Sequence, residues 1–449
     1  MNTTELSARV NGALVRPGDA GWDQARLFHS GIGEPDLIVR AAGVEDVRAA
    51  VAYAAAHDLP IGVRGGGHSA WGTVPGGVVI DLAALRDIRV DPATRRVSVG
   101  GGATWGDVAR TLAGEGLGIS SGDTASVGVG GLTLGGGIGW MVRAWGLAAD
   151  QLVGAQVVTA SGEVVEASAT EHPDLFWALR GGGGNVGVVT RFDFVAHALN
   201  DVVFARLRVS GDAAATLRAL RDLMRDAPPQ FTVTYMDVPA MDPNAPAGAG
   251  ITVCGIDTDV PATRSFLEPV LAVPGVAAEE IAVHSYPDVL MEMPGYDPDQ
   301  PPPGFVGGNT LIAELDDDVV DALVGFRATR PAAVLFLRSL GGAYGDVAPA
   351  DTPFPARSAT WFAMAGAFDV PGLLDAAGVA AAESEWAAIE AHGLARYANF
   401  SVSTDPEWAR RMYPEPVWSR LAAIKRTWDP GNLFRRNHNV PPASADGTS

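Results

Sequence analysis

Residues 64–69 read RGGGHS, and a second glycine cluster, GVGGLTLGGGIGW, follows at residues 128–140. Three successive glycines leave a stretch of backbone without side chains, so its N–H groups can close on an anion such as a pyrophosphate. His68 ends the triplet and would be held against the bound group. Because imidazole is a nucleophile near neutral pH, a ligand there could become covalently attached. One triplet can be a surface turn that ends in a histidine, but two clusters favour a ligand site.

Four blocks of the sequence resemble the FAD-linked oxidases related to berberine bridge enzyme and vanillyl-alcohol oxidase. They keep the family's order, and the chain between about residues 200 and 390 matches only loosely. The blocks are residues 60–72 (PIGVRGGGHSAWG), 122–150 (GDTASVGVGGLTLGGGIGWMVRAWGLAAD), 172–190 (HPDLFWALRGGGGNVGVVT) and 428–440, with WDPGNLFR and NHNV. The resemblance implies an α+β fold, in which a PCMH-type FAD-binding domain accompanies an α/β substrate domain with an antiparallel sheet flanked by helices.

Length and pattern favour two domains, because 449 residues are too many for one compact core. Short strands alternate with helices up to about residue 200, where the pattern changes. We expect an FAD-binding domain at 1–200, a substrate-binding domain at 201–395, and a berberine-bridge-like segment at 396–449 that returns to the first domain. In the second domain the expected strands lie at 202–209, 231–236, 250–256 and 359–365, and the expected helices at about 212–226, 260–272, 316–328 and 372–391.

Composition excludes several classes of partner. The net charge is −20, which would repel nucleic acid and anionic lipid, so we expect neither nucleic-acid nor membrane partners. No apolar stretch is long enough for a signal peptide or a membrane span, and we expect a soluble, cytoplasmic protein. Cys254 is the only cysteine and lies in an apolar run, so it is expected to be buried and inert. The histidines form no HxH or HExxH pair, and we expect no metal site.

The resemblance implies FAD bonded covalently to His68 through the 8α-methyl group of the flavin ring. Doubly attached relatives carry a cysteine where this chain has Thr124, so we expect attachment through His68 only, a less positive potential and a narrower cleft. Arg64 either pairs with the diphosphate or shapes the loop, Trp140 is more typical of packing, and Asp150 orders its loop. The other expected FAD contacts are Gly65, Gly66, Gly67, Ser69, Val127, Val129, Gly130, Gly131, Thr133, Gly136, Gly137, Gly139, Gly187, Val188, Val189, Asn437 and Asn439.

The candidate catalytic residues are Tyr397, Asn399 and Tyr344. Residues 397–400 (YANF) resemble a family strand that runs under the flavin and usually ends in a second tyrosine, the general base in several members. Phe400 cannot act as that base, so Tyr397 is either the remaining phenol or a buried structural residue. Further cleft candidates, each equally compatible with a structural role, are Tyr235, Asn309, Arg338, Arg357 and Trp361.

The resemblance implies two-electron oxidation of a small organic substrate, most consistent with a secondary metabolite. Hydride would pass to flavin N5, and dioxygen would be reduced to hydrogen peroxide. Val127 falls where oxygen-reactive relatives have a small aliphatic residue, which favours an oxidase over a dehydrogenase. Two alternatives stay open: a carbohydrate or oligosaccharide oxidase, and a flavin-carrying drug-binding or resistance protein with little turnover. A sugar groove needs aromatic walls, for which the expected rim loops at 237–249 and 294–304 and their surroundings offer only Met241, Tyr286 and Tyr296.

Overall fold

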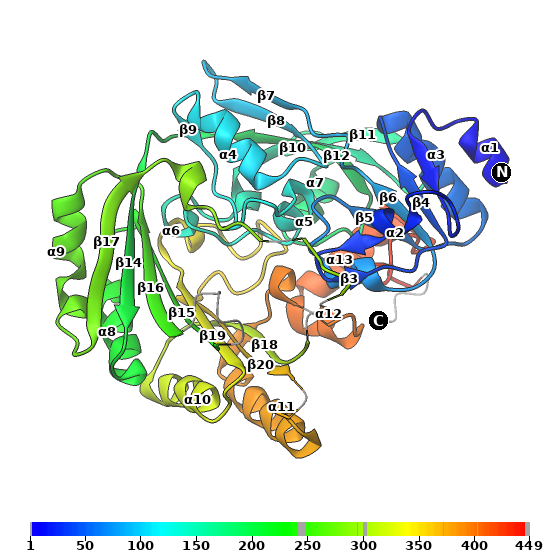
Figure 1. Cartoon of the computed structure of the whole chain (residues 1–449). Helices are drawn as coiled ribbons and strands as arrows, with labels where there is room; N and C mark the ends of the chain where they lie inside the picture. Colours follow the sequence, from blue (N-terminus) through cyan, green and yellow to red (C-terminus); the bar gives the residue numbers. More distant parts are fainter. Residues whose placement is uncertain are drawn as a thin grey trace.

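The computed structural model describes residues 2–240, 248–293, 295–299, 303–370, 372–401 and 403–444. Helices and strands are interleaved along the chain, which confirms the α+β class expected from the sequence. Elements from the first two hundred residues lie on one side of the molecule, and a large sheet flanked by helices lies on the other (Figure 1). The shorter elements are α1 (Thr3–Ser7), α2 (Trp22–Ala25), β2 (Leu27–Phe28), β3 (Gly31–Ile32), β9 (Leu117–Gly118), α6 (Val142–Trp145) and β13 (His197–Ala198).

A four-stranded sheet delivers the first glycine loop. Its strand order is β1 (Ala13–Val15), β4 (Leu37–Arg40), β6 (Val78–Asp81) and β5 (Ile61–Arg64), with β4 and β5 parallel to β6. Helix α3 (Val44–Ala56) buries its apolar stripe against this sheet. Because β5 ends at Arg64, residues 65–69 leave the sheet as a loop directly beyond its edge.

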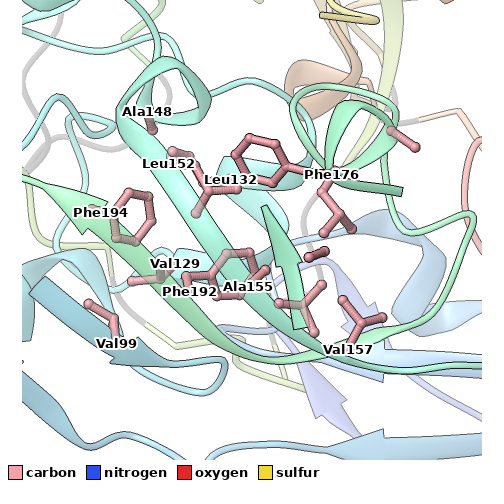
Figure 2. Close-up of a cluster of buried hydrophobic side chains, with 14 of the residues drawn as sticks. Val99, Val129, Leu132, Ala148, Leu152, Ala155, Val157, Phe176, Phe192 and Phe194 are labelled. Atoms are coloured by element: carbon pink, nitrogen blue, oxygen red, sulfur yellow. The ribbon is translucent and has the colours of Figure 1, made fainter. Parts of the chain in front are cut away.

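A second, antiparallel sheet supports the second glycine cluster. Its order is β11 (Val164–Ser168), β10 (Leu152–Val158), β12 (Val188–Val195), β8 (Arg96–Gly100) and β7 (Ile88–Asp91). Helices α4 (Trp105–Ala113), α5 (Val129–Leu134) and α7 (Pro173–Leu179) share its core. Val129 and Leu132 of α5 belong to the same buried cluster as Phe192 of β12 (Figure 2). The start of the second glycine cluster is thereby anchored in a hydrophobic core.

The third large sheet has eight antiparallel strands. Their order is β17 (Val276–His284), β14 (Val202–Val209), β16 (Gly248–Gly255), β15 (Phe231–Val238), β19 (Ala333–Ser339), β20 (Trp361–Asp369), β18 (Gly304–Ile312) and β21 (Gly393–Ala395). Helices α8 (Ala213–Arg225), α9 (Val260–Leu271), α10 (Asp317–Ala328) and α11 (Ala376–Glu390) share one buried apolar cluster with it. These helices cover one face of the sheet, and the other face is turned toward the first part of the chain (Figure 1).

The four strands and four helices expected in this region are confirmed with small shifts at their ends. Strands β17, β18 and β19 are not among the strands expected from the sequence. β18 carries glycines at positions 304, 307 and 308, which are typical of turns. Tyr235 and Trp361 belong to the cluster on the helix-covered face, which favours the structural one of the two roles considered for them. Side chains alternate between the faces of a strand, and a one-residue shift reverses the assignment.

The C-terminal residues pack into the first part of the chain. After α12 (Glu407–Met412) and α13 (Val417–Trp428), Leu433 and Phe434 join the core of the four-stranded sheet. Lys425 is fully buried and donates to the carbonyls of Asn185 and Phe434, with its Nζ 3.2 Å from a carboxylate oxygen of Asp429. These contacts support the proposed return of residues 396–449 to the first domain. Within the described residues, no helix has the length and apolar character that crossing a membrane would require.

Candidate functional site

The two glycine clusters touch each other through their backbones. A Cβ atom added to Gly66 would lie 2.3 Å from the backbone nitrogen of Gly128, and one added to Gly128 would lie 2.2 Å from that of Gly66. Gly67 has a φ of +77°, a conformation that L side chains rarely adopt. Glycine is therefore required at these positions so that the two loops can meet.

The first loop presents an unused row of hydrogen-bond donors. Among the described residues, no protein group accepts a hydrogen bond from the backbone N–H groups of residues 65–69. Successive free N–H groups on a loop form a concave site for an anion. On the second cluster, Gly131 is exposed, and a Cβ there would meet no atom within 4 Å. The open side of the paired loops is therefore polar and suited to a phosphate-containing ligand.

The His68 imidazole is held in a fixed orientation beside this loop. Its Nε2 lies 3.1 Å from Ser126 Oγ, and its ring stacks on His29 with the centroids 3.7 Å apart and the planes 14° from parallel. Burial and, less strongly, the neighbouring His29 together lower the pKa of His68 to about 4, although a hydrogen bond with the backbone of Ser126 opposes the shift. The ring is thus neutral at physiological pH, and Nδ1 makes no hydrogen bond among the described residues.

Several buried polar atoms around the loops have no hydrogen-bond partner in the part of the chain that the structure describes. They are Trp71 Nε1, Thr133 Oγ1, Asn437 Oδ1, His438 Nδ1 and Asn439 Oδ1. The Trp71 and His438 rings meet edge to face at 5.6 Å. Unpaired buried donors and acceptors are costly in a folded protein, and those that line the loops are available to a bound group. Together with the free N–H row, they fit FAD, which offers phosphate oxygens and a polar ring edge.

His438 is a site residue that the sequence analysis missed. Its side chain is buried, and burial lowers its pKa to about 4 despite a hydrogen bond to the backbone of Ala398. The carbonyl of His438 accepts from Asn185 Nδ2 at 3.3 Å. Its position between the predicted residues Asn437 and Asn439 was the available signal. Because Nδ1 has no partner among the described residues, Nε2 makes the hydrogen bond to the backbone, and the neutral ring can present Nδ1 to a ligand as an acceptor.

Arg64 faces inward and shapes the loop. Its guanidinium forms an ion pair with Asp81 and donates to the carbonyls of Ala25 at 2.6 Å and Leu27 at 3.3 Å. It also lies 5.0 Å from the centre of the Phe28 ring. Of the roles considered for Arg64, these contacts favour shaping the loop over pairing with a diphosphate.

The later glycines of the second cluster are enclosed by protein. A Cβ would lie 2.4 Å from the Phe354 ring at Gly136, 2.5 Å from Leu132 at Gly137, and 1.5 Å from the Ser121 carbonyl oxygen at Gly139. Packing therefore explains these glycines without a ligand. Along β12, Val188 and Val189 are buried, and a Cβ on Gly187 would lie 2.5 Å from Val157. The structure places Val129, Gly130 and Thr133 on α5, next to the open Gly131.

Two buried ion pairs join the residues that flank the second cluster to the large sheet and its loops. Asp123 accepts from Arg338 of β19 at 2.7 Å, and the Arg338 guanidinium lies 4.6 Å from the Trp140 ring centre. The neighbouring Thr124 hydroxyl donates to Asp123 at 3.0 Å. Asp150 accepts two hydrogen bonds from Arg357, at 2.7 and 2.8 Å. Trp140 and Asp150 thus have structural contacts, as the sequence analysis considered for both.

Tyr397 and Asn399 bind the backbone of the second cluster. The Tyr397 hydroxyl accepts from the N–H groups of Gly137 at 3.2 Å and Ile138 at 3.0 Å, and from Asn399 Nδ2 at 2.9 Å. Asn399 also donates to the Leu132 carbonyl at 2.9 Å. Burial raises the pKa of Tyr397 to about 12, despite these hydrogen bonds. Tyr344 shares a buried cluster with Tyr397, and its hydroxyl donates to the Ala356 carbonyl at 2.8 Å.

Cys254 lies on β16, in a buried cluster with Trp140 and Met141. Burial raises the pKa of its thiol to about 12, so it stays protonated. The expectation of a buried cysteine is confirmed. Val127 was predicted to lie next to the flavin. It is half-buried, and its carbonyl accepts a hydrogen bond from the Trp105 N–H at 2.9 Å.

Comparisons with known proteins agree with this geometry. Residues 35–168 match a family model described as FAD binding domain, and residues 396–441 match one described as berberine and berberine like. The (R)-6-hydroxynicotine oxidase of Paenarthrobacter nicotinovorans is 30% identical over 463 residues, which span 96% of this chain and 97% of that protein.

Solved structures match over nearly the whole chain. The 6-hydroxy-D-nicotine oxidase from Arthrobacter nicotinovorans has a TM-score of 0.81 and 28% identity, covering 99% of this chain and 100% of its own. A glucooligosaccharide oxidase from Acremonium strictum, described with a 6-S-cysteinyl, 8α-N1-histidyl FAD, has a TM-score of 0.83 and 22% identity, covering 98% of both chains. The PCMH-type fold predicted from the sequence is thereby confirmed.

Proposed function

Since this chain belongs to the FAD-linked oxidases related to berberine bridge enzyme and is an FAD-dependent oxidoreductase, we propose that it oxidises a small organic substrate by two electrons at the expense of dioxygen. The observation that carries this proposal is the neutral His68 imidazole beside five backbone N–H groups that donate to no acceptor among the described residues. A loop of this kind binds a diphosphate, and the imidazole is available as a nucleophile.

The residues around the loops have distinct proposed roles. Backbone groups of residues 65–69 would hold the diphosphate of FAD, and the N–H groups near Gly130 and Gly131 would hold the part of FAD next to the diphosphate. Asn437, His438 and Asn439 would hold polar edges of FAD. Bound FAD would supply the redox chemistry, accepting hydride at N5 and returning two electrons to dioxygen as hydrogen peroxide. Asp150 acts through Arg357 to fix its own loop.

We propose attachment through His68 alone. Thr124 has a hydroxyl where doubly attached relatives have a thiol, and a hydroxyl is a much weaker nucleophile. Cys254 lies in the core beside Trp140 with a protonated thiol, so it offers no second link. Ser126 engages Nε2 of His68, which favours Nδ1 as the attached nitrogen.

Tyr397 and Asn399 serve the substrate end by positioning. The Tyr397 oxygen already accepts three N–H donors, which makes it a poor acceptor for a substrate proton. It holds the backbone of Gly137 and Ile138 in place, and Phe400 next to it presents an apolar ring. We therefore assign removal of the substrate proton to a water molecule or to a basic group of the substrate itself.

A small secondary metabolite is favoured over an oligosaccharide. The oxidase of Paenarthrobacter nicotinovorans, which is 30% identical to this chain, acts by its name on (R)-6-hydroxynicotine. The glucooligosaccharide oxidase is 22% identical and shares only the fold. Of the aromatic or Met side chains expected to rim a sugar groove, Tyr286 is buried, Tyr296 is half-buried and Met241 lies outside the described residues. A cytoplasmic location stays a prediction.

The test mixes the purified yellow protein anaerobically with four probes: (R)-6-hydroxynicotine, a hydroquinone, a secondary alcohol and cellobiose. We expect at least one of the first three to bleach the visible flavin absorbance, and readmitted air to restore it with release of hydrogen peroxide. Protein incubated without a probe is the control. Spectral shifts without bleaching for every probe would contradict the proposal and favour a binding protein with little turnover.

A further inference from the structure

The face of the large sheet that points away from its helices carries two rows of side chains in register. One row runs Thr234, Arg338, Phe362 and Leu311 across β15, β19, β20 and β18. The next row runs Met236, Phe336, Met364 and Asn309 across the same strands. Because side chains of paired residues share a face, each row forms a continuous strip.

The first row is covered by the first part of the chain. Arg338 is paired with Asp123 and lies over Trp140, and Leu311 and Phe362 share a buried cluster with Ile138 and other residues of the second glycine cluster's surroundings. The second row is more open. Met236 and Met364 are only half-buried, although Phe336 between them is 5% exposed. The second row is therefore partly exposed at its two methionines, whereas Asn309 in the same row is fully buried.

Phe400 connects this open row to the candidate flavin site. Its ring lies 5.8 Å from that of Phe336 and 5.0 Å from that of Phe362. The same short segment carries Tyr397 and Asn399, which bind the backbone of the second glycine cluster. Met236, Phe336, Met364 and Phe400, here called the apolar wall, are thus continuous with the loops assigned to FAD.

The polar side chains of both rows are already engaged by protein groups. Arg338 donates to Thr234 at 2.9 Å and to Asp123 at 2.7 Å, so its charge is neutralised. Asn309 donates to the Tyr397 carbonyl at 3.1 Å and accepts from the Tyr397 N–H at 2.7 Å. A sugar hydroxyl placed on the wall would leave water without gaining a partner there, which is unfavourable.

We propose that the apolar wall binds a flat, weakly polar ring of the substrate, and that the substrate class is aromatic or heteroaromatic compounds and not oligosaccharides. This inference rests on the proposed function, because it places the wall at the substrate end of the flavin site. Methionine sulfur and phenylalanine rings both make favourable contacts with an aromatic ring. Methionine side chains also adapt to rings of different outline.

The test measures binding of 2-naphthol and of cellotetraose to the purified protein by calorimetry, with the flavin spectrum as a second readout. We expect 2-naphthol to bind and to perturb the visible spectrum. Cellotetraose should bind at least about tenfold more weakly, because the free-energy cost of one buried hydroxyl without a partner is enough for this difference in affinity. Met364→Gln and Met236→Gln should each weaken 2-naphthol binding by about tenfold, because the wall gains an amide without a partner.

Met364→Leu keeps an apolar side chain of similar size and should retain 2-naphthol binding. This variant separates the effect of a polar side chain on the wall from the effect of misfolding. Leu394→Gln, at a side chain 46% exposed on β21, is the matched control and should leave binding unchanged. Flavin-loaded protein that binds cellotetraose more tightly than 2-naphthol, or binds 2-naphthol equally well after Met364→Gln, overturns this inference. Parent protein that carries no flavin overturns the proposed function instead.

Discussion

His68→Ala is expected to abolish covalent attachment of FAD completely while the protein still folds. The side chain is half-buried at the edge of a loop, so its loss leaves the hydrophobic cores intact. The free N–H row and the buried polar atoms of residues 437–439 remain, and we expect FAD to bind reversibly. After acid precipitation the parent pellet should be yellow, and the pellet of the variant colourless with the flavin in the supernatant.

His392→Ala is the matched control, because His392 is exposed at the end of α11 and far from the loops in the sequence. Its pellet should be as yellow as that of the parent. A yellow pellet from His68→Ala would mean that another residue carries the flavin. Circular dichroism and the melting temperature of the variant establish that the colour loss does not follow from unfolding.

Lys425→Met is expected to lower the free energy of unfolding by about 3–5 kcal/mol, the usual cost of breaking a buried ion pair by removing one partner. Lys425 and Asp429 are both fully buried. The Asp429 carboxylate also accepts from the N–H groups of Leu433 at 2.7 Å and Phe434 at 2.9 Å. Without the ammonium group its charge would be buried without a countercharge. Urea unfolding followed by tryptophan fluorescence measures the change.

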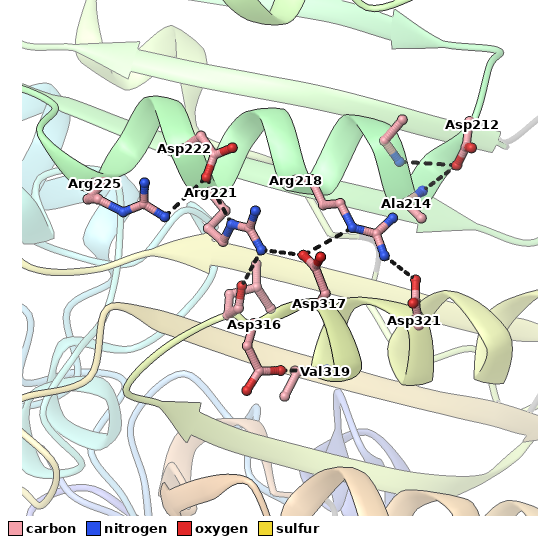
Figure 3. A network of polar contacts seen from close by, with 12 residues as sticks. Asp212, Ala214, Arg218, Arg221, Asp222, Arg225, Asp316, Asp317, Val319 and Asp321 are labelled. Atoms are coloured by element: carbon pink, nitrogen blue, oxygen red, sulfur yellow. Dashed lines mark hydrogen bonds and ion pairs between the residues drawn. The ribbon is translucent and has the colours of Figure 1, made fainter.

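The matched control is Arg218→Met on the surface of α8. Arg218 forms ion pairs with Asp317 at 3.1 Å and Asp321 at 2.6 Å, within a network of exposed charges on α8 and α10 (Figure 3). Exposed pairs contribute about 0–1 kcal/mol, so the change in unfolding free energy should be small. Equal decreases in unfolding free energy for the two variants would show that burial does not determine how strongly the Lys425–Asp429 ion pair stabilises the protein.

The position of the first loop follows from local sequence. A short β strand followed by GGGH specifies a loop at the end of β5, and the amphipathic pattern of residues 44–56 specifies α3 against the same sheet. The stack of His29 on His68 and the contact of Gly66 with Gly128 join segments that are distant in the sequence. No local pattern encodes such contacts, because they depend on how whole sheets pack.

The roles of the individual glycines also depend on tertiary contacts that no local sequence pattern encodes. In the sequence, Gly131 and Gly139 belong to one cluster and carry the same prediction. In the structure, Gly131 faces open space, whereas Gly139 is pressed against the Ser121 carbonyl. Tyr397 illustrates the point for a side chain: its residue type suggests a base, but its hydroxyl is already occupied by three donors. Hydrogen-bond partners decide between such roles, and they come from tertiary structure.

We propose that His68, held neutral and oriented beside an anion-binding loop, is the single covalent anchor of FAD. Intact mass spectrometry of the denatured, purified protein tests it most directly. We expect the mass of the polypeptide plus one FAD minus two hydrogens, with the added mass on the peptide that contains His68. A mass equal to the polypeptide alone, or a flavin found on any other peptide, would contradict it.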